Sequence, residues 1–196
     1  MPRNEDEEAR VRTLAITQNI TVDGSIEMLD DWFDPQGQAD VDSSDHMEEL
    51  HQQDRAADGF LVGRRTFEDL RGYWPLQTED TTGITDYLNG VSKHVVSSTM
   101  TDPGWEHTTV VSTDPIGAVR ELKEQSGKDI VVTGSITLCH ALIEAGLVEE
   151  FRLFTYPVVQ GRGRRLFPDG CSVPRLELLE VKAFRSGITL SRYATA

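Results

Sequence analysis

Short runs of β-branched and other apolar residues alternate with longer, helix-like segments over much of this chain. The runs that we interpret as strands cover residues 11–20, 60–62, 94–98, 108–112 and 130–132. A parallel pair of strands needs a crossover of a dozen or more residues, usually a helix, so this alternation is typical of a parallel sheet. We therefore expect an α/β fold with a mostly parallel central sheet and helices on both of its faces.

Turn and capping residues bound the segments between these strands. Asp114-Pro115 is typical of a helix start, whereas Gly59 and Gly146 are typical of helix ends. Helices are predicted at residues 44–58, from residue 64 onward, at 114–125 and at 136–145, with a loose region at 76–93. Further strands are predicted at residues 151–159, 176–184 and 188–193. The last two are expected to form an antiparallel hairpin at the edge of the sheet.

The length of 196 residues, of which 38% are hydrophobic, suits one compact domain, which we place at residues 11–196. Residues 1–10, MPRNEDEEAR, are charged and have no apolar anchor, so we expect a mobile acidic tail. They lack the apolar core of a signal peptide, and no window approaches the roughly 18 apolar residues of a membrane span. We therefore expect a soluble, cytoplasmic protein with no membrane partner.

Most of the net charge of −14 lies in the first third of the chain. Residues 1–58 hold 16 acidic and 4 basic residues, whereas residues 59–196 hold 17 acidic and 15 basic residues. A chain this acidic is a poor partner for nucleic acid, whose binding depends on neutralising phosphates. We therefore expect no nucleic-acid partner, and we expect any anionic ligand to bind a local positive patch in the later two thirds.

Cysteine and histidine spacing gives no sign of a metal site. The cysteines, Cys139 and Cys171, lie far apart without a CxxC pattern, and the 5 histidines show no ligand spacing. We expect free thiols and no bound metal.

Three of the predicted strands end in residues that suit anion binding. The strand at 60–62 continues into residues 63–66, GRRT, where backbone N–H groups at a helix start would meet two arginines. The strand at 94–98 ends in two serines, and the strand at 130–132 continues into residues 133–135, TGS. The carboxyl ends of parallel strands share one edge of a sheet, and ligands bind there.

Each of these motifs has a structural alternative. Arg64 and Arg65 could simply lie on an exposed helix start, and serine pairs are common in turns. Ser135 could cap the helix that follows it. Capping does not explain why Gly134 precedes it, or why three strand ends repeat one anion-binding design.

These motifs, in this order, resemble the dihydrofolate reductase fold, and more closely the reductase domain of riboflavin biosynthesis. Two further stretches strengthen the resemblance: residues 60–75, FLVGRRTFEDLRGYWP, and residues 142–170, LIEAGLVEEFRLFTYPVVQGRGRRLFPDG. The turn at residues 22–26, VDGSI, is similar to the Leu-Asp-Gly signature of that family. The resemblance covers residues 11–193 and implies a three-layer α/β/α fold with NADPH as its cofactor.

The resemblance also implies a role for each motif. Arg64 would meet the 2′-phosphate of NADPH, with Ser97 and Ser98 beside it, and the two helix starts would hold the pyrophosphate. The nicotinamide would lie near the first strand and the loop at Asp23. Ser135 replaces the second glycine of a pair that, in this family, can adopt an unusual peptide geometry. The implied cofactor-binding residues are Ile16, Thr17, Gly63, Arg64, Arg65, Thr66, Ser97, Ser98, Thr133, Gly134, Ser135, Ile136 and Thr137.

Asp23 is the candidate catalytic residue, because the family signature places it beside the active-site loop; aspartate before glycine is also common in turns. In dihydrofolate reductases, a carboxylate on the helix after the first loop contacts the pterin. That helix offers Asp45, Glu48 and Glu49 here, with capping or solvent exposure as the alternative role of each. The arginines at 161–165 either bind a substrate phosphate or lie on an ordinary surface loop.

The resemblance therefore implies an NADP-dependent oxidoreductase whose substrate is a small heterocycle, similar to a ribosylaminopyrimidine or a pterin. The zinc signature of the deaminase domain that commonly accompanies this reductase is absent, so we expect a stand-alone reductase domain. The alternative is a non-catalytic nucleotide-binding or scaffold protein of the same fold.

We also expect a homodimer, because relatives often pair through their terminal strands. The aromatic residues that either line a substrate pocket or pack in the core are Trp32, Phe33, Tyr73 and Trp74.

Overall fold

The computed structural model describes residues 11–29, 31–34, 40–173 and 175–196. An eight-stranded sheet runs through this part of the chain. Its strands are β1 (Leu14–Thr21), β2 (Ala57–Gly63), β3 (Ser92–Val96), β4 (Thr108–Val111), β5 (Asp129–Val132), β6 (Glu150–Tyr156), β7 (Glu177–Ala183) and β8 (Thr189–Ala194). The tail predicted at residues 1–10 lies outside the described residues.

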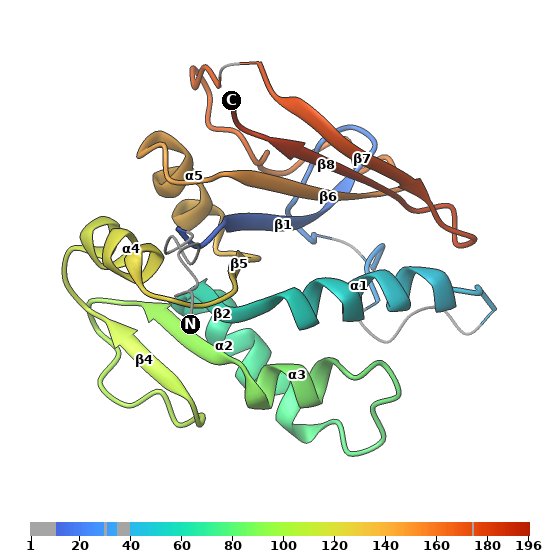
Figure 1. Ribbon diagram of the computed structural model, residues 1–196. Coiled ribbons are helices and arrows are strands. Elements are labelled where there is room, and N and C mark those ends of the chain that lie inside the picture. The colour runs from blue at the N-terminus through green and yellow to red at the C-terminus, as the bar shows by residue number, and fades with distance from the viewer. Residues whose placement is uncertain (1–10, 30, 35–39, 174) are drawn as a thin grey trace, which may run out of the picture.

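The strand order in the sheet is β4-β3-β2-β5-β1-β6-β8-β7, so β4 and β7 form its two edges (Figure 1). The strands from β4 to β6 in this order are parallel to one another. Strand β8 is antiparallel to both of its neighbours, β6 and β7. The predicted α/β fold, with its mostly parallel sheet and antiparallel C-terminal hairpin, is confirmed.

Helices lie in most of the connections between the parallel strands, whereas β3 and β4 are joined by a loop. The helices are α1 (Ser44–Ala56), α2 (Arg64–Tyr73), α3 (Ile84–Gly90), α4 (Pro115–Glu124) and α5 (Ile136–Glu144), with a short 3-10 helix, η1 (Trp74–Leu76), directly after α2. None of the helices in the described ranges is long and apolar enough to cross a membrane. Helix α3 lies in the region that was predicted to be loose, so the prediction is wrong at that point.

Helix α3 is stabilised by residues outside its own sequence, ITDYLNG. Gly83, with a φ of 76°, lets the chain turn into the helix. Leu88 is buried in the core, and the buried Nζ of Lys93 donates to its carbonyl oxygen at 2.6 Å. That bond satisfies a carbonyl that the end of the helix leaves free. Because these partners come from the flanking turn, strand β3 and the core, sequence periodicity did not indicate the helix.

The prediction that Gly59 ends the first helix is also wrong. Helix α1 ends at Ala56, and β2 begins at the next residue, so Gly59 lies inside the strand. A Cβ on Gly59 would lie 2.8 Å from Nη2 of the buried Arg12. The glycine therefore accommodates the close approach of an arginine side chain to the sheet.

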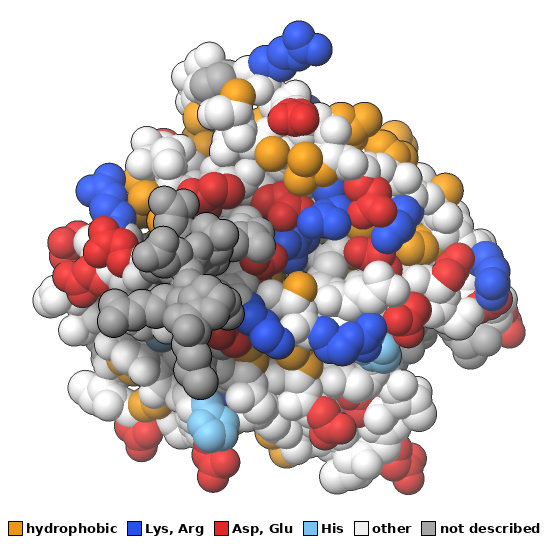
Figure 2. Space-filling view, in the orientation of Figure 1, with side chains coloured by type: hydrophobic (Ala, Val, Ile, Leu, Met, Phe, Trp, Pro, Cys, Tyr) orange, Lys and Arg blue, Asp and Glu red, His pale blue; other side chains and the backbone are white. Residues whose placement is uncertain are grey.

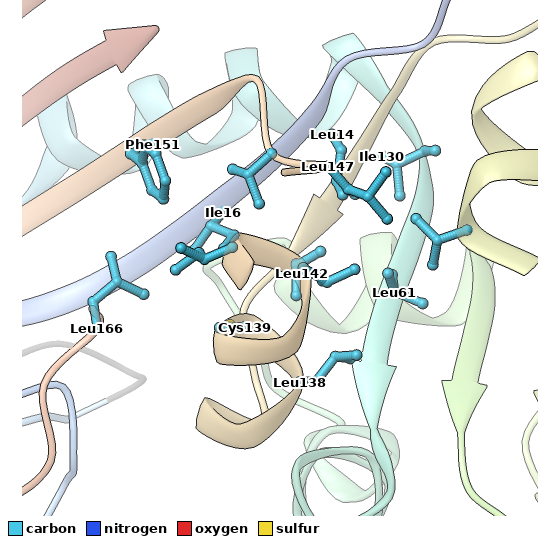
Figure 3. Packing of buried hydrophobic residues seen from close by; sticks show 14 of the residues in the cluster. Leu14, Ile16, Leu61, Ile130, Leu138, Cys139, Leu142, Leu147, Phe151 and Leu166 are labelled. Atoms are coloured by element: carbon cyan, nitrogen blue, oxygen red, sulfur yellow. The ribbon is translucent and has the colours of Figure 1, made fainter. Parts of the chain in front are cut away.

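Alternate residues of the central strands face two different layers of helices. Leu61 of β2 packs in a cluster with residues of α4 and α5, whereas Phe60 and Val62 pack with residues of α2 and α3. Figure 3 shows Leu138 and Leu142 of α5 among the buried side chains of the first cluster. The sheet is therefore the middle layer of three, as the resemblance implies.

Helix α1 covers the C-terminal half of the sheet on the same face as α2 and α3. Phe154 of β6 and Leu190 of β8 form a third cluster, against which Leu50 of α1 packs. Phe151, at an odd-numbered position of β6, instead packs on the α5 side. Since side chains alternate along a strand, Phe154 and α1 lie on the opposite face from α5.

Candidate functional site

Two glycines join the ends of β2 and β5 at the centre of the sheet. The N–H of Gly63 donates to the carbonyl oxygen of Gly134 at 3.0 Å. A Cβ on Gly63 would collide with the Ser135 hydroxyl and lie 3.0 Å from Cβ of Ser135. A Cβ on Gly134 would lie 2.8 Å from Oγ1 of Thr66. Glycine is therefore required at both positions, where the start of α2 meets the start of α5.

Ser135 lies directly before α5, and the peptide bond that joins Gly134 to Ser135 is cis. The unusual peptide geometry that the family's glycine pair can adopt is therefore present here, although serine replaces the second glycine. The side chain of Ser135 makes no capping hydrogen bond to the helix. Capping thus does not account for this serine, and its hydroxyl remains available to a ligand.

The start of α5 has the properties of an anion-binding site. The first hydrogen bond that closes the helix runs from the N–H of Cys139 to the carbonyl oxygen of Ser135, at 2.9 Å. The N–H groups of Ile136 and Thr137 precede that bond, so the helix itself supplies them with no acceptor. These N–H groups and the positive end of the helix dipole would together stabilise a phosphate group bound beside Gly134.

The two serines after β3 have different surroundings. Ser97 is buried, and its N–H donates to the carbonyl oxygen of Val111 at 3.0 Å. Its hydroxyl accepts the N–H groups of Thr99 and Met100, at 3.3 and 3.0 Å. Ser97 therefore shapes the turn, whereas Ser98 is exposed. Of the two hydroxyls, the one on Ser98 is free to meet a ligand.

The side chain of Arg64 connects the start of α2 to this turn. Its Nη1 donates to Oγ1 of Thr99, and its Nε donates to Glu68 at 2.8 Å. Arg65 is exposed and makes no ion pair with any residue that the structure describes. The sequence did not indicate Thr99, because its contact with Arg64 depends on β3 lying beside β2 in the sheet.

The predicted residues of β1 face opposite sides of the sheet. Ile16 is fully buried in the cluster beneath α5. Thr17 faces the α1 side, and its buried Oγ1 has no hydrogen-bond partner among the described residues. Gln18 donates to the carbonyl oxygen of Thr133 at 2.9 Å, which holds the residues before Gly134 against β1. No motif marked Gln18 in the sequence.

Asp23 holds two loops together. Its carboxylate accepts the hydroxyl of Thr21 at 2.6 Å and the N–H groups of Gln160 and Gly161 at 3.1 and 2.6 Å. These hydrogen bonds, led by that of Thr21, lower the pKa of Asp23 to about 2. The side chain is therefore ionised at neutral pH, when it cannot donate a proton. Its contacts support an anchoring role, and the catalytic role stays a prediction.

Gln160 is a second connection between these loops that the sequence did not indicate. Its Nε2 donates to Oγ of Ser25 at 2.8 Å and to the carbonyl oxygen of Glu27 at 3.0 Å. Its Oε1 accepts the indole N–H of Trp32 at 2.8 Å. One amide side chain thus ties the loop after β6 to the loop after β1.

The three acidic candidates on α1 all have partners. Glu49 is the buried one, with 5% of its surface exposed. The other two lie at the surface side of the helix. The ion pairs are Asp45 with Arg185, Glu48 with Arg55 and Glu49 with Lys182, at 3.9, 3.2 and 2.5 Å. Within the described ranges, no group of three or more His, Cys, Asp or Glu side chains is placed to hold a metal ion.

The candidate aromatic residues separate into two groups. Trp32 and Phe33 lie edge-on to Tyr156, with ring centroids at 5.3 and 5.9 Å, near the end of β6. Trp74 is buried in the cluster beneath α2, with the ring of Tyr73 at 5.1 Å. Only the first group lies near the loops that Asp23 and Gln160 join.

The arginines of the loop at 161–165 also differ in their contacts. Arg164 pairs with Glu27 at 2.7 Å, which adds a further tie between the two loops. Arg165 is exposed and has no ion pair within the described part of the chain. A substrate phosphate would therefore find Arg165 more available than Arg164.

The substitution Gly63→Ala should destabilise the protein by about 1–3 kcal/mol, because the new methyl group meets the side chain of Ser135. The double variant Gly63→Ala/Ser135→Gly should recover part of that loss, since it removes the Ser135 side chain with which the new methyl group collides. Urea denaturation of the wild type, both single variants and the double variant measures the coupling. Strictly additive effects would show that this contact does not require the glycine.

The substitution Asp23→Asn should destabilise the protein at neutral pH and lose this effect in acid. Because folding lowers the pKa of Asp23 from 3.8 to about 2, it favours the ionised carboxylate. The stabilisation is present above pH 3.8 and is lost as the pH falls through about 2. Melting temperatures across this range should converge for wild type and variant. A constant difference would contradict the assignment, and Asp69→Asn, at an exposed position, is the control.

Comparisons with known proteins agree with this geometry. The family model for the RibD C-terminal domain matches residues 12–190. The uncharacterized protein YyaP of Bacillus subtilis (strain 168) is 29% identical over 184 residues, which cover 90% of this chain and 92% of YyaP.

Two solved structures share the fold at low identity. A pyrimidine reductase-like protein from Corynebacterium diphtheriae superposes with a TM-score of 0.66 at 18% identity, covering 95% of this chain and 93% of that one. Dihydrofolate reductase from Enterococcus faecalis, complexed with NADP(H) and RAB-propyl, gives a TM-score of 0.61 at 15% identity, covering 93% and 96%. Together with the family match over most of its length, this shows that the chain belongs to the RibD C-terminal domain family.

Proposed function

We propose that residues 11–196 form a stand-alone, NADPH-dependent reductase of a small heterocyclic substrate, similar to a ribosylaminopyrimidine or a pterin. The observation that carries the proposal is the junction of Gly63 with Gly134, which brings two helix starts to one point at the carboxyl edge of the sheet. The family match supports a reductase, and a structural neighbour is described in complex with NADP(H).

The residues at this edge fit the cofactor. Arg64, with Ser98 and Thr99 beside it, would hold the 2′-phosphate. The helix starts on either side of the junction would hold the pyrophosphate from two directions, with Arg65 supplying a free positive charge to an otherwise acidic chain. When bound, the nicotinamide would supply a hydride, and the protein would orient the substrate beside it.

The alternative, a nucleotide-binding or scaffold protein without turnover, is favoured by one observation. The acidic side chains considered for the active site already have partners: Asp23 binds backbone groups of the loop after β6, and the three acids of α1 pair with basic side chains. A proton for the substrate would then come from another group or from water. Oxidation of NADPH that depends on an added pterin or aminopyrimidine would exclude this alternative.

Replacing Arg64 with alanine should weaken NADPH binding about tenfold or more and leave NADH binding unchanged, because only NADPH has a 2′-phosphate. Isothermal titration calorimetry with each cofactor measures both affinities. Arg120→Ala, which removes an exposed arginine of α4, is the matched control. Equal losses for NADPH and NADH, or binding of neither cofactor to the wild type, would contradict the proposed cofactor site.

We also propose that two copies of the chain pair through β7. This edge strand exposes Leu178, Leu179 and Val181 to the extent of 55, 49 and 59%. Figure 2 shows hydrophobic side chains along the upper right margin of the molecule, where β7 lies in Figure 1. Exposed apolar side chains on an unpaired strand edge are typical of an interface between chains.

Sedimentation at micromolar concentration should give a dimer for the wild type and a monomer for Val181→Lys. A lysine at this edge adds a charge that a paired strand would bury, whereas Val159→Lys places the same charge at another exposed valine as a control. A monomeric wild type, or a dimer that survives Val181→Lys, would contradict pairing through β7.

A further inference from the structure

Helix α1 presents polar side chains to the sheet, where a covering helix usually presents an apolar stripe. Its buried residues are His46, Glu49 and Gln53. Glu49 is satisfied by Lys182 of β7 at 2.5 Å. His46 lies between Phe154 and Phe184, with ring centroids 5.0 and 5.1 Å from its own. Unlike Glu49, His46 has no hydrogen-bond partner for its Nε2 among the described residues.

Four buried side-chain atoms in the described part of the chain lack a hydrogen-bond partner: Thr17 Oγ1, His46 Nε2, Tyr87 OH and Arg152 Nη1. Thr17 and Arg152 lie side by side on β1 and β6, and they alternate with residues that face α5. His46 contacts Phe154 on the opposite face from α5, and α3, which carries Tyr87, packs on that face too. All four atoms therefore belong to the face that α1 and α3 cover.

Buried polar atoms without partners are unfavourable and uncommon in folded proteins. A polar ligand on this face would complete their hydrogen bonds. The opposite face, beneath α5, is packed with aliphatic and aromatic side chains (Figure 3). The face beneath α1 and α3 also packs two apolar clusters, so what distinguishes it is that its buried polar atoms without partners lie among apolar side chains.

Two of the four atoms lie toward the cofactor edge. Thr17 directly precedes Gln18, whose side chain holds Thr133 before the glycine junction. Phe154, on which His46 packs, pairs with Asn19, two residues farther along β1. Arg152, in contrast, reaches back to Asp129 at the start of β5. Thr17 and His46 therefore flank the part of β1 that leads to the predicted nicotinamide position.

We propose that Thr17 and His46 are specificity-determining residues that hydrogen-bond the polar edge of the substrate, a flat, neutral heterocycle with ring N–H and carbonyl groups. The inference rests on the proposed function and names the contacts that its substrate makes. A threonine hydroxyl can donate and accept, and a neutral imidazole nitrogen can do either according to its tautomer, so both suit such an edge.

The surroundings of His46 keep its ring uncharged. Burial lowers the pKa of His46 and outweighs the opposite effect of the carboxylates of Asp45 and Glu49. Those carboxylates are themselves paired, with Arg185 of the C-terminal hairpin and Lys182 of β7. Its ring also lies against two phenylalanine rings, which carry no charge.

The charges beneath α1 also favour a neutral ligand. Arg152 is paired with Asp129 at 2.7 Å and with Glu150 at 3.0 Å, and Glu150 also accepts Arg192 at 2.7 Å. A charged ring placed beside these pairs would find no free counterion, whereas a neutral ring needs only hydrogen bonds.

The test uses lumazine, a fluorescent pteridinedione, as the probe, and the full chain with and without NADP⁺. Thr17→Val, His46→Phe and His46→Gln are compared with the wild type and with Thr13→Val, a control on the same chain segment before β1. We expect lumazine to bind about tenfold or more weakly to Thr17→Val and His46→Phe. His46→Gln should lie between them and the wild type, because glutamine keeps a polar atom.

Three readouts separate recognition from a structural role. NADP⁺ affinity, measured by calorimetry, should be unchanged in both His46 variants, and the melting temperature of Thr17→Val should not fall, since a buried hydroxyl without a partner becomes a methyl group. The ¹⁵N resonance of the His46 ring should shift when lumazine binds the wild type.

Lumazine affinity within about twofold of the wild type in both Thr17→Val and His46→Phe would overturn the inference, as would a wild type that binds no lumazine. Failure of the proposed cofactor site has a different signature, namely no NADP⁺ binding to the wild type. In that case the lumazine titrations of the cofactor-free proteins decide the inference by the same comparison.

Discussion

The contact between the ends of β2 and β5 is the constraint on which the candidate site depends. A single hydrogen bond joins Gly63 to Gly134, and each glycine lies against a side chain from the other segment. Because neither glycine carries a side chain, the two strand ends approach closely, and α2 and α5 begin next to one another. Two helix starts are then aimed at one place, and the positive charge that an acidic chain needs for an anion is gathered there.

The two faces of the sheet differ in the polar groups that they bury. Beneath α4 and α5, the strands bury aliphatic and aromatic side chains that hold β1, β2 and β5 in register. On the other face, β1 and β6 carry threonine, arginine and glutamate beside two apolar clusters, and α1 buries polar side chains against them. Both faces therefore supply core packing, and on the second the buried polar groups lie among its apolar clusters.

The loops after β1 and β6 complete the site through polar contacts. Asp23 and Gln160 each bind backbone groups from the opposite loop, so the two loops form one structure at the carboxyl edge. These contacts give Asp23 an anchoring role in the structure. Its low pKa is a result of the same hydrogen bonds that hold the loop in place.

The sequence by itself determined the strand–helix alternation, the C-terminal hairpin and the three motifs at strand ends, because these depend on side-chain periodicity and on local backbone preferences. It did not indicate the place of Gly59 inside β2 or the contacts of Thr99 and Gln160, since each depends on residues distant in the chain. It also missed α3, a short helix that depends on burial of Leu88 and on the side chain of Lys93 in the next strand. Only the tertiary structure decided that Thr17 Oγ1 and His46 Nε2 lie on the same face of the sheet and lack hydrogen-bond partners among the described residues. Whether a buried polar atom is satisfied depends on everything packed around it, and no local pattern contains that information.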